Sequence, residues 1–303
     1  MEKKEKALVI VNPKSGRIKV KSQLFNIADY FSQSGIETTV YTTSARGDAR
    51  DYARDLSGHF DFVVARGGDG TLNEVLNGIM RAEVKKPVGY IPAGTTNDFA
   101  KTLRIPTDTK KAIEVIVKNE PRPHDLGVLN DEIYFSYTAS FGLFTRASYA
   151  TPQGYKNLFG YYAYLIEGAK ELLHLRPIPV KITCDGVAYE GEYIFVAITN
   201  SLSVGGIMKY SPDLPNFNDG KFEVLLAKKP PTLKEIVDLV LNARNQQYDE
   251  RYITILQGTE IVCESNEEIP WTLDGEYGGK YKTTTLRCLQ NAVEFFSEPE
   301  PGE

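Results

Sequence analysis

Residues 61–74 read Asp-Phe-Val-Val-Ala-Arg-Gly-Gly-Asp-Gly-Thr-Leu-Asn-Glu, and they constrain the fold more than any other stretch of the chain. The apolar run predicts a buried strand, and three glycines in four positions predict a tight turn that lets the backbone approach another group closely. Thr71 and Glu74 have the spacing of a capping box, which predicts a helix beginning here. A strand, a glycine-rich turn and a helix N-terminus together favour an anion-binding site, with an ordinary tight turn as the alternative.

The carboxylate in this turn needs a separate explanation. Asp69 would repel a bound phosphate unless a cation lay between the two negative charges. Carboxylate oxygens are preferred ligands of magnesium, so Asp69 is predicted to contact Mg²⁺ directly or through water.

Two other turns of unusual composition also follow predicted strands. Residues 12–16, Asn-Pro-Lys-Ser-Gly, follow the apolar run at residues 7–11, and residues 92–99 follow a short strand at residues 87–91. Predicted strands and helices alternate up to about residue 120, which indicates an open α/β domain. Ligands of such sheets bind at the carboxyl ends of the strands, so the three turns are expected to converge on one site.

The remainder of the chain has a different character. Short predicted strands dominate, with a hairpin signal at Asp185-Gly186 and one helix expected at residues 232–244. The predicted strands include residues 133–139, 260–264, 283–289 and 292–296. The fold class predicted is an N-terminal three-layer α/β domain, residues 1–122, completed by residues 290–303, and a mostly antiparallel β-sandwich domain, residues 123–289. An aromatic helix is expected at residues 155–175, either as a core helix or as a surface that meets lipid.

Composition limits the number of domains, the binding partners and the cellular compartment that we expect for the protein. With 303 residues the chain can hold two domains, and a net charge of −5 provides no field that attracts nucleic acid. Three scattered cysteines indicate a reducing cytosol rather than a disulfide framework or a zinc site. The charged N-terminus predicts no signal peptide, and the absence of a long apolar run predicts that any membrane contact is peripheral.

Two turns of the second domain carry acids. Asp274 and Glu276 flank a glycine beside Trp271 and Leu273, and a hairpin turn alone would account only for the Asp-Gly pair. One of these acids could be a general base that takes a hydroxyl proton, with the other as its partner. The turn that contains Asp219 could offer oxygen ligands to a hard cation, or it could be a plain polar turn.

Taken together, these motifs resemble a known family. Gly67-Gly68-Asp69-Gly70-Thr71 is similar to the nucleotide motif of diacylglycerol, sphingosine and NAD kinases and of phosphofructokinases. The motifs at residues 12–16, 72–74, 94–99, 218–220 and 274–279 narrow the resemblance to the diacylglycerol kinase catalytic family, in particular its soluble bacterial lipid kinases. The resemblance covers essentially residues 6–296.

The resemblance implies ATP and Mg²⁺ as cofactors, diacylglycerol as the lipid substrate, and a place at the cytoplasmic face of the membrane. It is compatible with a homodimer. Glu276 would be the proton acceptor, with Asp274 as rival or partner and Asp69 near the catalytic magnesium. Asp219, with the backbone carbonyls of Asn216 and Lys221, would hold a structural magnesium. The ATP site would be lined by Asn12, Pro13, Lys14, Ser15, Gly16, Thr43, Gly67, Gly68, Asp69, Gly70, Thr71, Leu72, Asn73 and Thr95.

Three alternatives remain at this point. The acceptor could be another lipid alcohol, such as a sphingoid base, or a soluble molecule as in NAD kinase. The chain could also be a nucleotide-binding regulatory module without catalysis, although the acids at positions 69, 274 and 276 speak against this. No local motif in the sequence identifies the head group of the acceptor.

Overall fold

The computed structural model describes residues 4–16, 20–95, 97–142, 175–200, 203–204, 208–209, 218–244 and 247–299. The chain forms two compact units. Unit 1 contains Met1–Leu126, Ile133–Ser136 and Leu289–Glu303, and unit 2 contains Gly127–Glu132 and Tyr137–Cys288. The aromatic helix expected at residues 155–175 lies outside the described residues, except for its last position.

Unit 1 is built on a parallel sheet in the order β2-β1-β3-β4, extended at β4 by the end of strand β15. The bounds are Lys6–Val11 for β1, Glu37–Thr42 for β2, Phe62–Gly67 for β3, Val88–Pro92 for β4 and Glu276–Phe296 for β15. All six residues of β3 and all five of β4 are buried, because helices cover both faces of the sheet and leave no solvated side.

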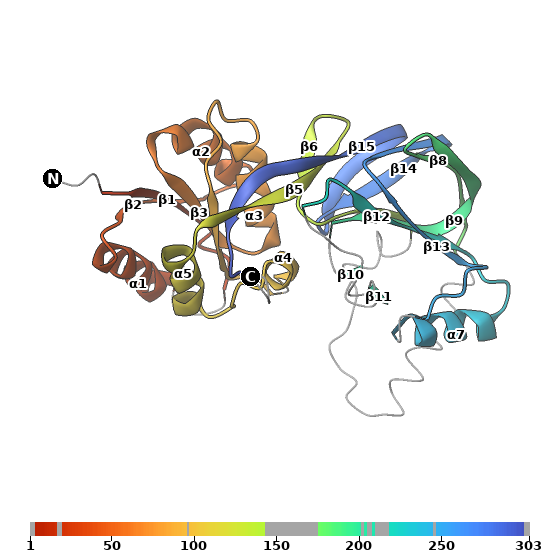
Figure 1. Ribbon diagram of the computed structural model, residues 1–303, viewed down its shortest axis with the longest axis horizontal. Coiled ribbons are helices and arrows are strands. Elements are labelled where there is room, and N and C mark those ends of the chain that lie inside the picture. Colours follow the sequence, from red (N-terminus) through yellow and green to blue (C-terminus); the bar gives the residue numbers. More distant parts are fainter. Residues whose placement is uncertain are drawn as a thin grey trace. The chain divides into compact units, whose positions relative to one another are not determined.

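Helices cover unit 1 on two sides of this sheet, as Figure 1 shows. Helix α1 (Val20–Gln33) packs against α5 (Thr109–Lys118), and α2 (Asp48–Leu56) packs against α3 (Asp69–Ile79). The close approach of α2 and α3 depends on Gly78, where a Cβ atom would collide with the carbonyl oxygen of Arg50. Short elements η1 (Ser57–His59), α4 (Asp98–Thr102) and β6 (Ile133–Phe135) complete the unit, and strand β5 (Pro121–Leu129) runs from unit 1 into unit 2.

Unit 2 is an antiparallel structure in which two long strands share the same two neighbouring strands. Strand β9 (Val187–Thr199) and strand β14 (Glu260–Leu273) each pair with β7 (Thr138–Gly142) and with β8 (Ile178–Cys184), so that these four strands form a closed ring of pairings. Trp271 lies in the interior and its ring packs edge-on against Phe141, with ring centroids 4.9 Å apart. The ring of pairings leaves few open sheet edges among the four strands.

Further strands extend this ring on one side. Strand β12 (Phe222–Lys228) pairs with β9, and β13 (Ile253–Gly258) pairs with β12. The short pair β10 (Ser203–Val204) and β11 (Met208–Lys209) and helix α7 (Leu233–Arg244) are the remaining elements in the described part of this unit. No helix among the described residues is both long and apolar enough to cross a lipid bilayer.

The predicted fold class, an α/β unit plus a mostly antiparallel β unit, is confirmed, but several element bounds differ. The strand expected at residues 133–139 is broken into β6 and β7. The strands expected at residues 283–289 and 292–296 are one continuous strand, β15, which runs from unit 2 into unit 1. Local sequence did not reveal this continuity, because Gln290 and Asn291 interrupt the apolar pattern.

Candidate active site

The three unusual turns follow neighbouring parallel strands of unit 1. Loop 1 (residues 12–16) follows β1, loop 2 (residues 67–70) follows β3, and loop 3 (residues 93–97) follows β4. Because β1 and β4 flank β3 in the sheet, all three loops lie at the same edge. Their convergence was expected from the sequence, and the contacts below describe how it is achieved.

Loop 1 is organised by the side chain of Asn12. Its Oδ1 accepts a hydrogen bond from the N–H of Lys14 at 2.9 Å, and its Nδ2 donates to Oγ1 of Thr71 at 3.2 Å. The first bond holds the loop in a turn and the second ties it to helix α3. Pro13 and Lys14 are exposed, and Ser15 is half-buried. Thr43 lies beside the loop, since its N–H donates to the carbonyl oxygen of Val11 at 2.9 Å.

Loops 2 and 3 touch through glycine backbones. A Cβ atom on Gly94 would lie 2.6 Å from Cα of Gly68, and a Cβ atom on Gly68 would lie 3.2 Å from Cα of Gly94. Gly67 is equally restricted, because a Cβ atom there would collide with the side chain of Thr71. Any side chain at these positions would push the loops apart, so the glycines are required by close approach of the backbone.

The capping box expected at Thr71 and Glu74 is not formed. Helix α3 begins at Asp69 with Gly68 as its N-cap, two residues earlier than Thr71. The hydroxyl of Thr71 is instead the acceptor for Asn12, and the carboxylate of Glu74 accepts from the N–H of Gly47 at 2.9 Å. The capping pattern was misleading because both side chains find partners from other loops.

Asp69 has a structural role that the sequence did not predict. Its Oδ2 accepts from the N–H of Asp98 at 3.2 Å, and its Oδ1 accepts from the N–H of Phe99 at 3.3 Å. These are the first N–H groups of helix α4, so the carboxylate of loop 2 holds the helix that follows loop 3. Its charge, together with burial as the larger cause, also raises the pKa of Tyr90. The magnesium contact of Asp69 stays a prediction.

Asn97 completes loop 3 and was not singled out from the sequence. It has a left-handed backbone conformation, φ 48°, and is 5% exposed. Its Oδ1 accepts from the N–H of Gly94 at 2.8 Å, and its Nδ2 donates to the Gly94 carbonyl oxygen at 3.1 Å. The amide side chain thus fixes the glycine that touches loop 2. Thr95, between them, is exposed.

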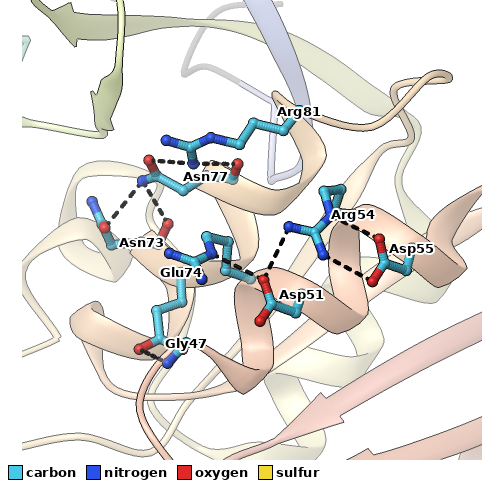
Figure 2. A network of polar contacts seen from close by, with 9 residues as sticks. Gly47, Asp51, Arg54, Asp55, Asn73, Glu74, Asn77 and Arg81 are labelled. Carbon is cyan, nitrogen blue, oxygen red and sulfur yellow. Dashed lines mark hydrogen bonds and ion pairs between the residues drawn. The ribbon is translucent and has the colours of Figure 1, made fainter.

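Two of the predicted ATP-site residues point elsewhere. Leu72 is 1% exposed and belongs to the core of unit 1. Asn73 contacts Asn77, and both side-chain amides donate to the carbonyl oxygen of Tyr134, at 3.2 and 2.8 Å. In Figure 2 the side chains of Asn73 and Asn77 meet, while Glu74 reaches Gly47. The structure brings loops 1, 2 and 3 together, while the side chain of Leu72 is in the core and that of Asn73 bonds to Tyr134; their place in an ATP site stays a prediction.

A buried cation beneath loop 1 was also missed. Arg66 is 1% exposed, and its Nη1 lies 3.4 Å from the carbonyl oxygens of Asn12 and Ser15. Burial lowers the pKa of its guanidinium group, although an arginine stays charged at neutral pH. A sequence signal did exist, since this arginine directly follows the apolar run of residues 62–65.

In unit 2, the two acids at residues 274–276 have different surroundings. Asp274 and Gly275 form the two-residue turn between β14 and β15, with φ values of 49° and 83°. Asp274 is 4% exposed, and its Oδ1 accepts from the N–H groups of Tyr137 and Thr138 at 3.0 and 3.1 Å. Glu276 is exposed. A register shift beside it places Gly278 opposite no partner residue, and such bulges re-aim neighbouring side chains.

The predicted structural magnesium site is only partly described. Asn216 lies outside the described residues. Oδ1 of Asp219 accepts from the N–H of Lys221 at 3.0 Å. The nearby carboxylate of Glu223 is 2% exposed; burial, and to a smaller extent Asp219, raises its pKa to about 7. No group of three or more His, Cys, Asp or Glu side chains suited to a metal occurs in the described ranges, so this site stays a prediction.

Comparison with known proteins identifies the family. A family model described as the diacylglycerol kinase catalytic domain matches residues 6–129, and one described as the YegS C-terminal NAD kinase beta sandwich-like domain matches residues 138–297. A diacylglycerol kinase of Bacillus subtilis (strain 168) is 36% identical over 277 residues, 91% of each chain. One of Staphylococcus saprophyticus is 32% identical over 295 residues, 97% of this chain and 96% of the relative.

Solved structures agree with these matches. A crystal structure of a diacylglycerol kinase from Bacillus anthracis str. Sterne has a TM-score of 0.76 at 25% identity and covers 99% of both chains. A second chain from the same organism has a TM-score of 0.82 at 27% identity, with the same coverage. Because the similarity spans both units and includes relatives above 30% identity, the protein belongs to the diacylglycerol kinase family of enzymes.

Proposed function

We propose that this protein transfers the γ-phosphoryl group of ATP to the hydroxyl group of diacylglycerol and so forms phosphatidic acid. The observation that carries the proposal is the backbone contact between loops 2 and 3, where a Cβ atom on Gly94 would collide with Gly68. Such a cradle, next to the N-terminus of helix α3, suits the phosphates of a nucleotide. The names of the relatives supply the acceptor class.

Phosphoryl transfer requires positioning and neutralisation of charge more than covalent chemistry by the protein. The three loops would hold the donor phosphates, and the half-buried carboxylate of Asp69 would face a bound Mg²⁺. Magnesium would neutralise the charge that develops on the transferred group. The fit is chemically reasonable, because carboxylate oxygens are preferred ligands of magnesium and each oxygen has two lone pairs.

Glu276 is our candidate for the general base, and Asp274 is not. Asp274 is buried and its Oδ1 already accepts from two backbone N–H groups, so this carboxylate is less accessible to an acceptor hydroxyl. Glu276 is exposed and can therefore meet an acceptor hydroxyl. In the proposed reaction its carboxylate takes the hydroxyl proton as the acceptor oxygen attacks the γ-phosphorus, the bond from that phosphorus to the bridging oxygen breaks, and ADP leaves.

A soluble acceptor is the second candidate. The model that matches residues 138–297 describes a domain like the β-sandwich of NAD kinase, an enzyme whose name indicates a water-soluble acceptor.

If diacylglycerol is the acceptor, the enzyme must reach a lipid in a membrane, and we propose that it contacts the cytoplasmic face peripherally. We also propose that the protein works as a homodimer, which light scattering coupled to size exclusion would test.

Labelled ATP in mixed micelles tests the reaction directly. The purified protein is incubated with labelled ATP and Mg²⁺ in four separate reactions, which contain diacylglycerol, a sphingoid base, ceramide or NAD. We expect labelled phosphatidic acid in the reaction with diacylglycerol and little product with the other three acceptors. Labelled NADP would establish the soluble-acceptor alternative, and a phosphorylated sphingoid base would change the lipid class. Absence of all products, with ATP intact, would overturn the kinase proposal.

A further inference from the structure

The guanidinium group of Arg66 lies against the inner side of loop 1. Its Nη1 donates to the carbonyl oxygens of Asn12 and Ser15, both at 3.4 Å. Its Nη2 lies 3.6 Å from the position that a Cβ atom on Gly16 would take. The side chain is 1% exposed, so it acts on loop 1 from behind rather than from the solvent side.

The carbonyl oxygen of Ser15 fixes the direction of the next N–H group. In a trans peptide the C=O and the N–H of the same unit point in opposite directions. Because the Ser15 carbonyl points at Arg66, the Gly16 N–H points away from Arg66, toward the outer side of the loop. Gly16 has φ +92°, a conformation that L side chains rarely adopt, so a glycine is needed for this orientation.

The other donors of loop 1 are used inside the protein. The N–H of Asn12 donates to the carbonyl oxygen of Arg66, that of Lys14 to Oδ1 of Asn12, and that of Ser15 to the carbonyl oxygen of Asn12. Pro13 has no N–H. In the described part of the chain, no backbone acceptor is found for the Gly16 N–H. Loop 1 therefore presents this one backbone donor outward.

We propose that Arg66 is a positioning residue of the nucleotide site, which turns the Ser15 carbonyl inward and thereby aims the Gly16 N–H at a phosphate of the bound nucleotide. The proposal rests on the proposed use of ATP and names which backbone donor of loop 1 binds the phosphate chain. The buried positive charge behind the loop adds attraction for an anion, because electrostatic interactions are strong where water is excluded. The contribution is therefore specific for phosphates and not for the nucleoside.

Amide-resolved hydrogen exchange on the unmodified protein tests the orientation. The exchange rates of Ser15 and Gly16 are measured alone, with saturating Mg²⁺ and the non-hydrolysable analogue AMP-PNP, and with adenosine. We expect AMP-PNP to slow exchange at Gly16 by at least about tenfold and adenosine to leave it unchanged. Ser15, which is already hydrogen-bonded, should change less. AMP-PNP that binds without protecting Gly16 overturns this inference alone, and failure of AMP-PNP to bind overturns the proposed function as well.

Chemical rescue separates positioning from general support of the fold. Arg66→Ala should raise KM for ATP about tenfold or more, as expected for a charged hydrogen-bonding group, and change kcat little. Millimolar guanidinium should lower that KM again without affecting the unmodified enzyme. Arg81→Ala is the matched control, since Arg81 bonds to Asn77 on helix α3 and should affect stability rather than KM. The proposal is contradicted if folded Arg66→Ala has an unchanged KM for ATP, or if guanidinium does not lower a raised KM. If Arg66→Ala fails to fold, the hydrogen-exchange measurement decides.

Discussion

The glycine-rich turn of unit 1 and the Asp274–Gly275 turn of unit 2 each contain an aspartate that accepts two backbone N–H groups. Asp69 holds the start of helix α4, and Asp274 holds the start of strand β7. The difference is exposure: Asp69 is half-buried, whereas Asp274 is 4% exposed and Glu276 beside it faces solvent. An acid in a motif can therefore serve the fold, the chemistry or both, and exposure separates these cases.

Glu276→Gln should produce the largest effect, because it removes the proposed base without changing shape. We expect kcat to fall by about 10²–10⁴-fold, the usual contribution of general base catalysis, with ATP affinity and melting temperature unchanged. Steady-state kinetics and calorimetric ATP binding provide the measurement. The exposed Glu268→Gln on strand β14 is the control. Normal turnover in Glu276→Gln would remove Glu276 from the mechanism.

Asp69→Asn tests whether one carboxylate serves both fold and chemistry. Asparagine keeps one acceptor for helix α4 but loses the charge, so activity should fall by about 10–100-fold and the Mg²⁺ concentration for half-maximal rate should rise. Activity is measured as a function of Mg²⁺ at saturating ATP. A variant that loses stability but keeps the magnesium dependence of the unmodified enzyme would make Asp69 purely structural, like Asp274.

Asp274→Asn tests the opposite case. Two charge-assisted hydrogen bonds are weakened at a buried position, so the free energy of unfolding should fall by about 2–3 kcal/mol. The rate per folded molecule should remain within about threefold, because no chemistry is assigned to this carboxylate. Denaturant unfolding and kinetics on the same preparation measure both. A large fall in kcat at unchanged stability would mean that the two acids of this turn share the base function.

His124→Phe concerns the core near loop 3 and should give the smallest effect. The imidazole is 4% exposed between Phe99 and Phe295, and burial lowers its pKa from 6.5 to about 4. The unfolded chain therefore binds the proton more readily between these values. Its stabilising contribution is complete above pH 6.5 and is lost as pH falls toward 4.

Between pH 7 and pH 5 this linkage should cost about 1–2 kcal/mol of stability, which His124→Phe should abolish. Denaturant unfolding at each pH measures it, and the surface variant His59→Gln is the control. An identical pH dependence in His124→Phe would show that other groups cause the acid lability.

The sequence predicted unit 1 better than unit 2, for a physical reason. Continuous apolar strands and glycine turns are local signals, and the buried strand and the tight glycine turn expected within residues 61–74 are both present. Strands β14 and β15 were underestimated, because the parts nearest their shared turn, residues 265–273 and 276–282, contain exposed polar residues and register shifts that interrupt the alternating pattern. Likewise the roles of Asp69, Asp274 and Asn97 depend on backbone groups that only the folded chain brings near.

The continuity of β15 has a consequence for how the protein is made. Residues 289–299 supply the last strand of unit 1, where Phe295 pairs with Val88 and packs against Phe99. The ribosome synthesises these residues after all of unit 2. Unit 1 therefore cannot complete its core during synthesis of its own first 126 residues, and a fragment that ends at residue 129 would lack Phe295, which packs against both Phe99 and His124. The order of synthesis and the order of folding must differ in this chain.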